Sequence, residues 1–129
     1  MKQNVTLTIA SLLSILLLTL HITDDIVRGI SKAEPSNIAL AVLVVLLYGT
    51  LVLAERRSGY VIILLGSLLG SGIPVIHFMG KGVGVAGRIG NTSGAFFFVW
   101  TLIALGVTAL FSVILSVRGL WSPQWGQSR

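Results

Sequence analysis

The sequence has no cysteine and few charged side chains. Without cysteine, the chain has no disulfide framework, no CxxC metal site, no thiol redox relay and no cysteine nucleophile. Charged residues make up 10% of the chain, whereas a soluble domain has about 25%. Hydrophobic residues make up 54%. This composition predicts an integral membrane protein rather than a water-soluble domain.

The nine basic and four acidic residues gather in short clusters, and long uncharged runs lie between them. A bilayer core needs about 20 helical residues, and the continuous apolar runs do not have the alternating pattern of membrane β-strands. Because no small-residue cleavage site follows the first run, we expect a retained helix there and not a signal peptide. We expect one all-α domain over residues 1–129, a four-helix transmembrane bundle with spans at about 5–22, 36–54, 60–79 and 95–117.

The basic residues favour a topology with both termini in the cytoplasm. Four spans place both termini and the turn at residues 55–59 on one side of the membrane. That side carries more of the basic residues than the other, namely Lys2, Arg56, Arg57, Arg118 and Arg129. Cytoplasmic loops are enriched in Lys and Arg. We therefore expect a multi-pass protein of the inner or plasma membrane, with a glycine-rich outer loop at residues 80–94.

Small residues mark the faces on which we expect the helices to pack. In lipid, helices associate through small side chains and interhelical hydrogen bonds. The third span has a GxxxG motif, and the fourth repeats small residues every four positions; these packing residues are Gly66, Gly70, Thr108, Ser112 and Ser116. The second span is bulky and aliphatic. We expect the other three spans to pack together and the second to face lipid or a partner, with self-association through GxxxG as an alternative.

Both histidines lie at the carboxyl ends of odd-numbered spans. His21 and His77 therefore share the non-cytoplasmic end of the bundle. If the first helix continues to a stop at Gly29, Asp24 and Asp25 project beside His21 at i+3 and i+4. Imidazole and carboxylate together suit a divalent metal such as zinc, copper or iron. Two histidines on separate helices also suit haem, and ionisable groups within a membrane suit a proton relay.

The alternative interpretation of these polar residues is structural. Histidines at the water interface are not costly, and Asp24 with Arg28 at i+4 makes an exposed ion pair worth about 0.3–0.5 kcal/mol. In the ligand-binding interpretation, the glycine-rich loop folds back over the mouth of the bundle and covers His77. The sequence leaves both interpretations open.

Other activities are not indicated. Residues 82–87 match GxGxxG, but they follow a membrane span and not a strand, so we expect no dinucleotide site. The basic residues form no stripe, so we expect no nucleic-acid partner. We find no convincing Ser-His-Asp arrangement and expect no catalytic residues. The span interiors lack the charge that an ion-coupled transporter uses.

Two functional hypotheses remain. The first is a non-catalytic accessory or structural subunit, a membrane protein whose partners are the lipid bilayer and other membrane subunits or a second copy of itself. The alternative is a metal- or haem-binding redox or proton-handling protein. Its site would be the non-cytoplasmic mouth of the bundle, formed by His21, Asp24, Asp25 and His77.

Overall fold

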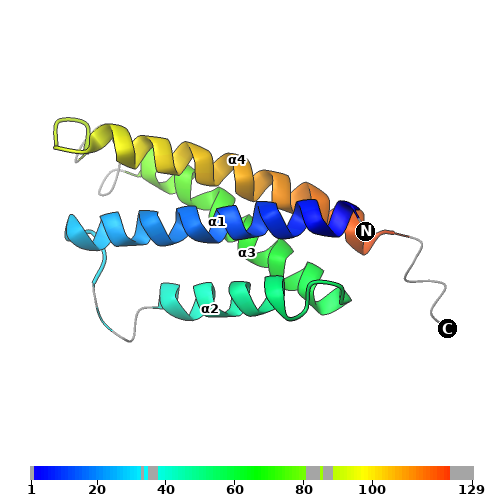
Figure 1. Ribbon diagram of the computed structural model, residues 1–129. Coiled ribbons are helices and arrows are strands. Elements are labelled where there is room, and N and C mark those ends of the chain that lie inside the picture. Colours follow the sequence, from blue (N-terminus) through cyan, green and yellow to red (C-terminus); the bar gives the residue numbers. More distant parts are fainter. Residues whose placement is uncertain (1, 33, 35–37, 81–84, 86–88, 123–129) are drawn as a thin grey trace.

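The computed structural model describes residues 2–32, 34, 38–80, 85 and 89–122, and the regular structure in this part of the chain is helical. The helices are α1 (Lys2–Val27), α2 (Ile38–Leu51), α3 (Arg57–Met79) and α4 (Ala95–Leu120). Consecutive helices run in roughly opposite directions, so the start of α1 and the end of α4 lie at the same end of the molecule (Figure 1). The carboxyl ends of α1 and α3 lie at the other end. This arrangement is compatible with the expected four-helix bundle.

Three of these helices are long and apolar enough to cross a membrane. They comprise Val5–Val27 of α1, Arg57–Met79 and Ala95–Leu120. A bilayer core of about 30 Å needs about 20 residues, which each of them exceeds. The structure thus supplies long apolar helices where the first, third and fourth spans are expected.

The second span is shorter than expected. The helix α2 has 14 residues, about 21 Å at about 1.5 Å per residue, whereas the expected span covers residues 36–54. The turn between α2 and α3 covers residues 52–56 and includes part of the charged segment at 55–57, so the apolar residues that follow Leu51 lie in this turn. The amides of Val52 and Leu53 both donate to the carbonyl of Tyr48, at 2.9 and 3.3 Å. Residues 36–37 lie outside the described part of the chain.

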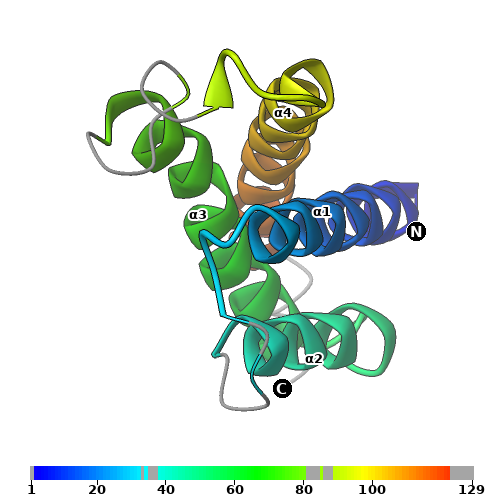
Figure 2. The same cartoon turned by 90° about the vertical axis from the view of Figure 1, so that its left-hand side faces the viewer.

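The helix α4 packs against both α1 and α3 and holds them together. Its inward stripe recurs every three or four residues and is at most 1% exposed: Phe98, Leu102, Leu105, Ala109, Ser112 and Ser116. The direct contact between α1 and α3 is small. Seen end-on, α1 lies between α4 and α2 (Figure 2). The buried residues of α2 are Leu46, Gly49 and Thr50, so most of its surface faces outward.

Both glycines of the GxxxG motif face neighbours within the same chain. A Cβ at Gly66 would overlap the side chain of Leu46 on α2. At Gly70, a Cβ would lie 3.4 Å from that of Ala109 on α4. The motif thus allows α3 to pack closely against two helices of the same chain, α2 and α4.

The small polar residues of α4 are also packed inside the chain. Ser112 and Ser116 are fully buried, while Thr108 is half-buried. The hydroxyls of Thr108 and Ser112 each donate to the carbonyl four residues earlier, at 3.0 and 2.9 Å. Such back-bonding satisfies a hydroxyl without a partner from another helix.

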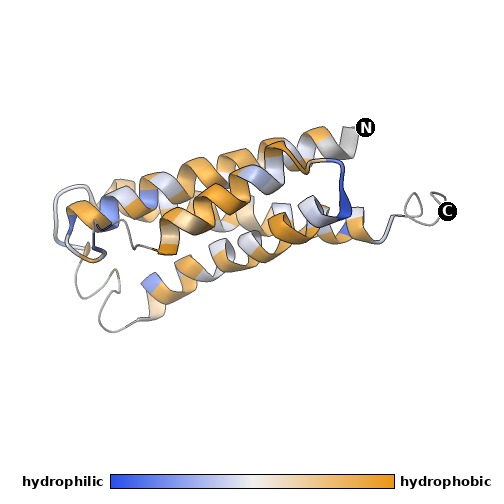
Figure 3. Ribbon diagram, turned by 90° about the horizontal axis from the view of Figure 1, so that it is seen from below, coloured by the Kyte–Doolittle hydropathy of each residue, from blue (hydrophilic) through white to orange (hydrophobic). Residues whose placement is uncertain are grey.

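Large apolar side chains cover the outside of the molecule. On α1, the residues Val5, Ile9, Leu13 and Leu16 form an outward stripe and are 45–59% exposed. The most hydrophilic segments lie near the helix ends, the α2–α3 connection among them (Figure 3). Monomeric proteins in water rarely expose continuous apolar surfaces of this extent. The surface is suited to lipid along the lengths of the helices.

Candidate metal centre

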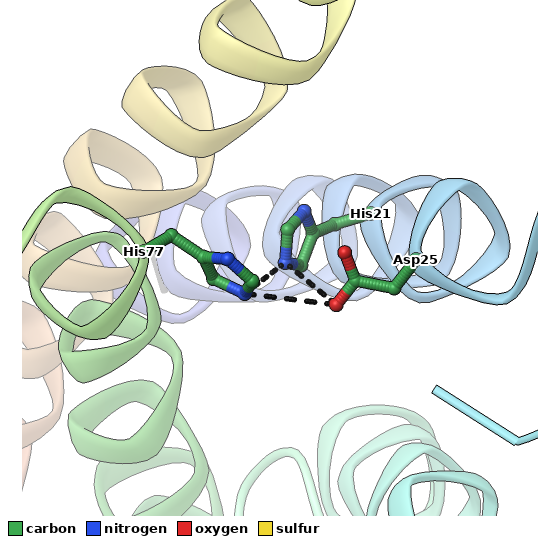
Figure 4. Close-up of side chains that lie close together, drawn as sticks. All are labelled: His21, Asp25 and His77. Atoms are coloured by element: carbon green, nitrogen blue, oxygen red, sulfur yellow. Dashed lines mark hydrogen bonds and ion pairs between the residues drawn. The ribbon is translucent and has the colours of Figure 1, made fainter. Parts of the chain in front are cut away.

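His21, Asp25 and His77 converge at the end of the molecule where α1 and α3 finish (Figure 4). The Nε2 atoms of the two histidines are 3.1 Å apart. The Oδ2 atom of Asp25 lies 3.5 Å from Nε2 of His21 and 3.6 Å from Nε2 of His77. Each residue therefore directs one potential ligand atom to a common point.

Two local features of the chain bring these residues together. First, α1 continues past His21 to Val27, so Asp25 lies one helical turn after His21 on the same face. Gly29, with φ of 70°, then ends the helix, and the amide of Ile30 caps the carbonyl of Asp25 at 2.8 Å. Second, His77 lies in the last turn of α3, whose inner face α4 holds toward α1.

All three residues are buried. The exposed fractions are 1% for His21, 8% for Asp25 and 7% for His77. Within the described residues, Nδ1 of His21 and Oδ1 of Asp25 have no hydrogen-bond partner. A buried polar group without a partner costs about 1–3 kcal/mol, and a charged one costs more. The Nε2 atoms of the two histidines share a hydrogen bond at 3.1 Å, so the atoms of the cluster left without partners among the described residues are Nδ1 of His21 and Oδ1 of Asp25, and neither is one of the three atoms that converge.

An aromatic side chain forms the inner wall of the cluster. Phe98 of α4 is fully buried, and its ring centroid lies 5.2 Å from that of His21 and 5.3 Å from that of His77. Ile89, itself 1% exposed, packs against Phe98. Water is therefore excluded on the α4 side, and access to the three polar side chains is from the other side.

Asp24 does not join the cluster. Its carboxylate accepts a hydrogen bond from Nε of Arg28 at 2.9 Å. The same guanidinium donates to Oγ1 of Thr92 at 2.7 Å and to the carbonyl of Ser93 at 3.0 Å, and it lies 5.4 Å from the centre of the Phe98 ring. Arg28 thus fastens the end of α1 to the segment that precedes α4.

The spacing of the three ligand atoms fits a transition metal. The circle through atoms with separations of 3.1, 3.5 and 3.6 Å has a radius of about 2.0 Å, and zinc binds histidine nitrogen and carboxylate oxygen at about 2.0–2.2 Å. In a tetrahedron with such bonds, ligand atoms are about 3.3 Å apart. An ion slightly outside the plane of these atoms would therefore reach all three without rearrangement of the backbone.

A cavity of about 340 Å³ lies beside the cluster, between α1, α2 and α3. His21, Asp25 and His77 line one part of it, and most of the remaining wall is apolar, with residues such as Leu18, Ile22 and Ile73. A metal held by the three side chains would have its open coordination position on this side, because Phe98 covers the other. Three protein ligands with an open position are typical of catalytic rather than structural metal sites.

Comparison of the chain with protein-family models, with curated proteins and with solved structures finds no match. The interpretation of the site therefore depends on its own geometry.

Of the four residues expected at the mouth of the bundle, His21, Asp25 and His77 lie together and Asp24 lies apart. Sequence reasoning identified the Asp24–Arg28 pair as an alternative, and the structure contains it together with the three-residue cluster. It missed Phe98 and the bonds from Arg28 to the segment before α4. The aromatic run at 96–98 was visible, but the sequence gives no indication of which ring faces inward. Residues 81–84 and 86–88 of the glycine-rich loop expected to cover His77 lie outside the described part of the chain.

Proposed function

We propose that this chain is a multi-pass membrane metalloprotein that holds one divalent transition metal ion with His21, Asp25 and His77. The observation that carries the proposal is the convergence of three buried ligand atoms around a point within metal–ligand bonding distance of each. The burial of a carboxylate beside two imidazoles supports it, since all three residues are at most 8% exposed. An ion would compensate the cost of that burial.

The membrane location is supported by the three long apolar helices and their outward apolar stripes. In this proposal α2 packs beside them as a shorter helix. The end that carries Glu55, Arg56, Arg57 and Arg118 faces the cytoplasm, because basic residues are enriched there. The metal site then lies near the opposite, outer face of the membrane, and both chain termini are cytoplasmic.

The ligand set favours zinc or iron(II). Two imidazoles and one carboxylate are the ligands of many hydrolytic zinc sites and of non-haem iron(II) sites with open positions. Haem is a poorer fit. Axial ligands on opposite sides of an iron atom stand about 4 Å apart with bonds of about 2.0 Å, whereas the two Nε2 atoms are 3.1 Å apart and a carboxylate lies beside both.

Metal analysis of the purified protein tests this proposal. We expect about one zinc or iron ion per chain, and we expect His77→Ala or Asp25→Asn to weaken zinc binding by more than about 100-fold, because even outer-shell changes cost about 10–100-fold. Asp24→Asn is the matched control, since it makes the same chemical change one residue away in a carboxylate paired with Arg28. Equal zinc affinity in Asp24→Asn and Asp25→Asn, or no bound metal in native material, would overturn the proposal.

A role as an accessory subunit remains a second candidate because of the exposed face of α2. Large apolar residues such as Leu40, Val44 and Leu47 are 41–60% exposed there. Such a surface suits lipid or a helix of another membrane subunit. Copurification from native membranes distinguishes a lipid-facing helix from one that binds another subunit. A stoichiometric partner that copurifies with the native chain but not with the Val44→Lys variant would support the subunit role. A metal site and a partner are compatible with each other.

A further inference from the structure

We infer that the open side of the metal site binds a single-chain anionic lipid, with its carboxylate on the metal ion and its chain in the groove between α2 and α3. This inference rests on the proposed metal site and adds the class of molecule that the site takes. Two observations support it. The polar cluster lies at one end of an apolar groove, and a divalent metal with these ligands would have a net positive charge without a counter-ion.

A second cavity adjoins the one beside the cluster. This second cavity has a volume of about 270 Å³ and lies between α2 and α3. The two share the wall residues Val42, Gly66 and Leu69. Beyond these, the second cavity is lined by apolar residues only, with Val45 and Ile62 among them. In our inference these two adjoining cavities serve as one elongated groove, with the three polar side chains at one end.

The dimensions of this groove suit one hydrocarbon chain. On α3, its wall extends from His77 to Ile62, about 22 Å of helix at about 1.5 Å per residue. The two volumes, about 340 and 270 Å³, fall near the lower end of the range of about 300–1,000 Å³ for small-molecule sites. At Gly66, a shared wall residue, the place of the absent side chain is taken by Leu46 of α2, which brings the two helices close together.

The groove opens to the surroundings of the helices. Its wall residues Val45, Leu65 and Leu69 are 53–63% exposed, so the groove is accessible along its side. In a bilayer, a lipid chain enters such a groove laterally without crossing water. Any lipid chain would fill an apolar groove, so specificity has to come from the polar end.

The charge at the polar end favours an anionic head group. A divalent ion with two neutral imidazoles and one carboxylate carries a net charge of about 1+, and buried charge without a counter-ion is costly. The nearest other carboxylate, that of Asp24, is engaged by Arg28 at 2.9 Å. A carboxylate from a ligand would balance the charge and supply an oxygen donor to the open coordination position. A long-chain carboxylate combines this head with the chain that the groove accommodates.

Binding of labelled palmitate to the zinc-loaded, full-length protein in neutral-lipid nanodiscs tests the inference. We expect zinc to tighten palmitate binding by about tenfold or more relative to chelated protein, and palmitate to bind about tenfold or more tightly than its methyl ester, because the ester lacks the anionic donor. Acetate, which lacks the chain, should bind weakly. Equal binding of acid and ester, or binding independent of zinc, would overturn the inference. Preferential binding of a two-chain phospholipid would do the same.

Variants separate the groove from the metal site. Ala41 lines the groove and its neighbour Leu40 does not, although both are exposed on α2. We expect Ala41→Trp to lower palmitate affinity by about tenfold or more with unchanged zinc content, and Leu40→Trp to change neither; Val45→Trp is a second blocking variant. Zinc retained with palmitate binding unaffected by both blocking variants would refute the groove. Failure to bind zinc at all would instead refute the proposed function.

Discussion

Replacing Asp25 with asparagine should change stability in opposite directions with and without metal. In the metal-free protein, Oδ1 of Asp25 has no hydrogen-bond partner among the described residues. Its Oδ2 lies 3.5 and 3.6 Å from the two histidine nitrogens, beyond the usual 2.7–3.2 Å of a hydrogen bond. The carboxylate is therefore a poorly satisfied buried group, which asparagine replaces with a neutral group of the same shape.

The expected magnitudes follow from this geometry. A buried polar group without partners costs about 1–3 kcal/mol and a charged one costs more; asparagine keeps the polar group but removes its charge, so we expect Asp25→Asn to stabilise the metal-free protein by about 1 kcal/mol. For a chain of this length, 1 kcal/mol corresponds to roughly 4 °C in melting temperature. Metal at about 100 times its dissociation constant adds about 2.7 kcal/mol to the native protein, and a variant with about 100-fold weaker affinity gains only about 0.4 kcal/mol at the same concentration.

Thermal unfolding followed by circular dichroism in detergent, with either a chelator or zinc, measures both effects. We expect Asp25→Asn to melt above the native protein in the chelator and below it in zinc, because the metal stabilisation that it loses, about 2.3 kcal/mol, exceeds that gain. The Asp24→Asn variant should show the native response to zinc. If Asp25→Asn instead melts lower in the chelator and zinc has no effect on either protein, the carboxylate balances a protonated histidine. The cluster would then be a structural ion pair, whose disruption costs about 3–5 kcal/mol.

Three further predictions concern the framework of the site. Gly59→Ala should destabilise the fold by about 1–3 kcal/mol, because its Cβ would overlap the backbone of Leu53. In contrast, a Cβ at Gly72 would meet nothing within 4 Å, so Gly72→Ala should stabilise the fold by about 0.5–1 kcal/mol. Equal melting temperatures for the two variants would contradict this prediction. Arg28→Gln should speed amide exchange of residues 89–94 while leaving the middle of α4 unchanged, because it removes the fastening to that segment; unchanged exchange in both regions would disprove the role of Arg28. Ser116→Ala should be neutral or stabilising by about 1 kcal/mol, since its hydroxyl is buried without a partner among the described residues; a clear loss of stability would indicate a partner.

The helices could be predicted well because their cause is local. An uncharged apolar run of about 20 residues has few alternatives to a helix in lipid, and α3 and α4 begin and end close to the expected limits. The length of α2 could not be predicted in the same way. Its apolar run continues past Leu51, but the helix ends there, and the turn that follows packs so closely on Gly59 of α3 that a Cβ at Gly59 would overlap the backbone of Leu53. That contact depends on tertiary packing, which hydropathy does not contain.

The candidate site could also be predicted only in part, because local patterns place some of its residues and long-range contacts place the others. Helical periodicity places Asp25 one turn after His21, and the chain direction places His77 at the same end, so these three could be expected to lie near one another. Periodicity alone also places Asp24 close to His21. The pairing of Asp24 with Arg28 has local i,i+4 spacing, but Thr92 and Ser93 also hold the guanidinium, from a segment more than sixty residues away. Long-range contacts of this kind decide which of two adjacent carboxylates is free to bind a ligand.

The packing of the helices suggests that an ion bound by the cluster would also link α1 to α3. The helix α4 holds both α1 and α3, while these two have little direct contact apart from the region of the histidines. A metal ion at this point would join two helices that are otherwise linked mainly through a third. It would also fix the polar end of the cavity that α1, α2 and α3 line. If the metal and the lipid bind as proposed, metal occupancy and the shape of the groove would be coupled through the same three side chains, and a ligand that binds the metal would favour the arrangement that the metal stabilises.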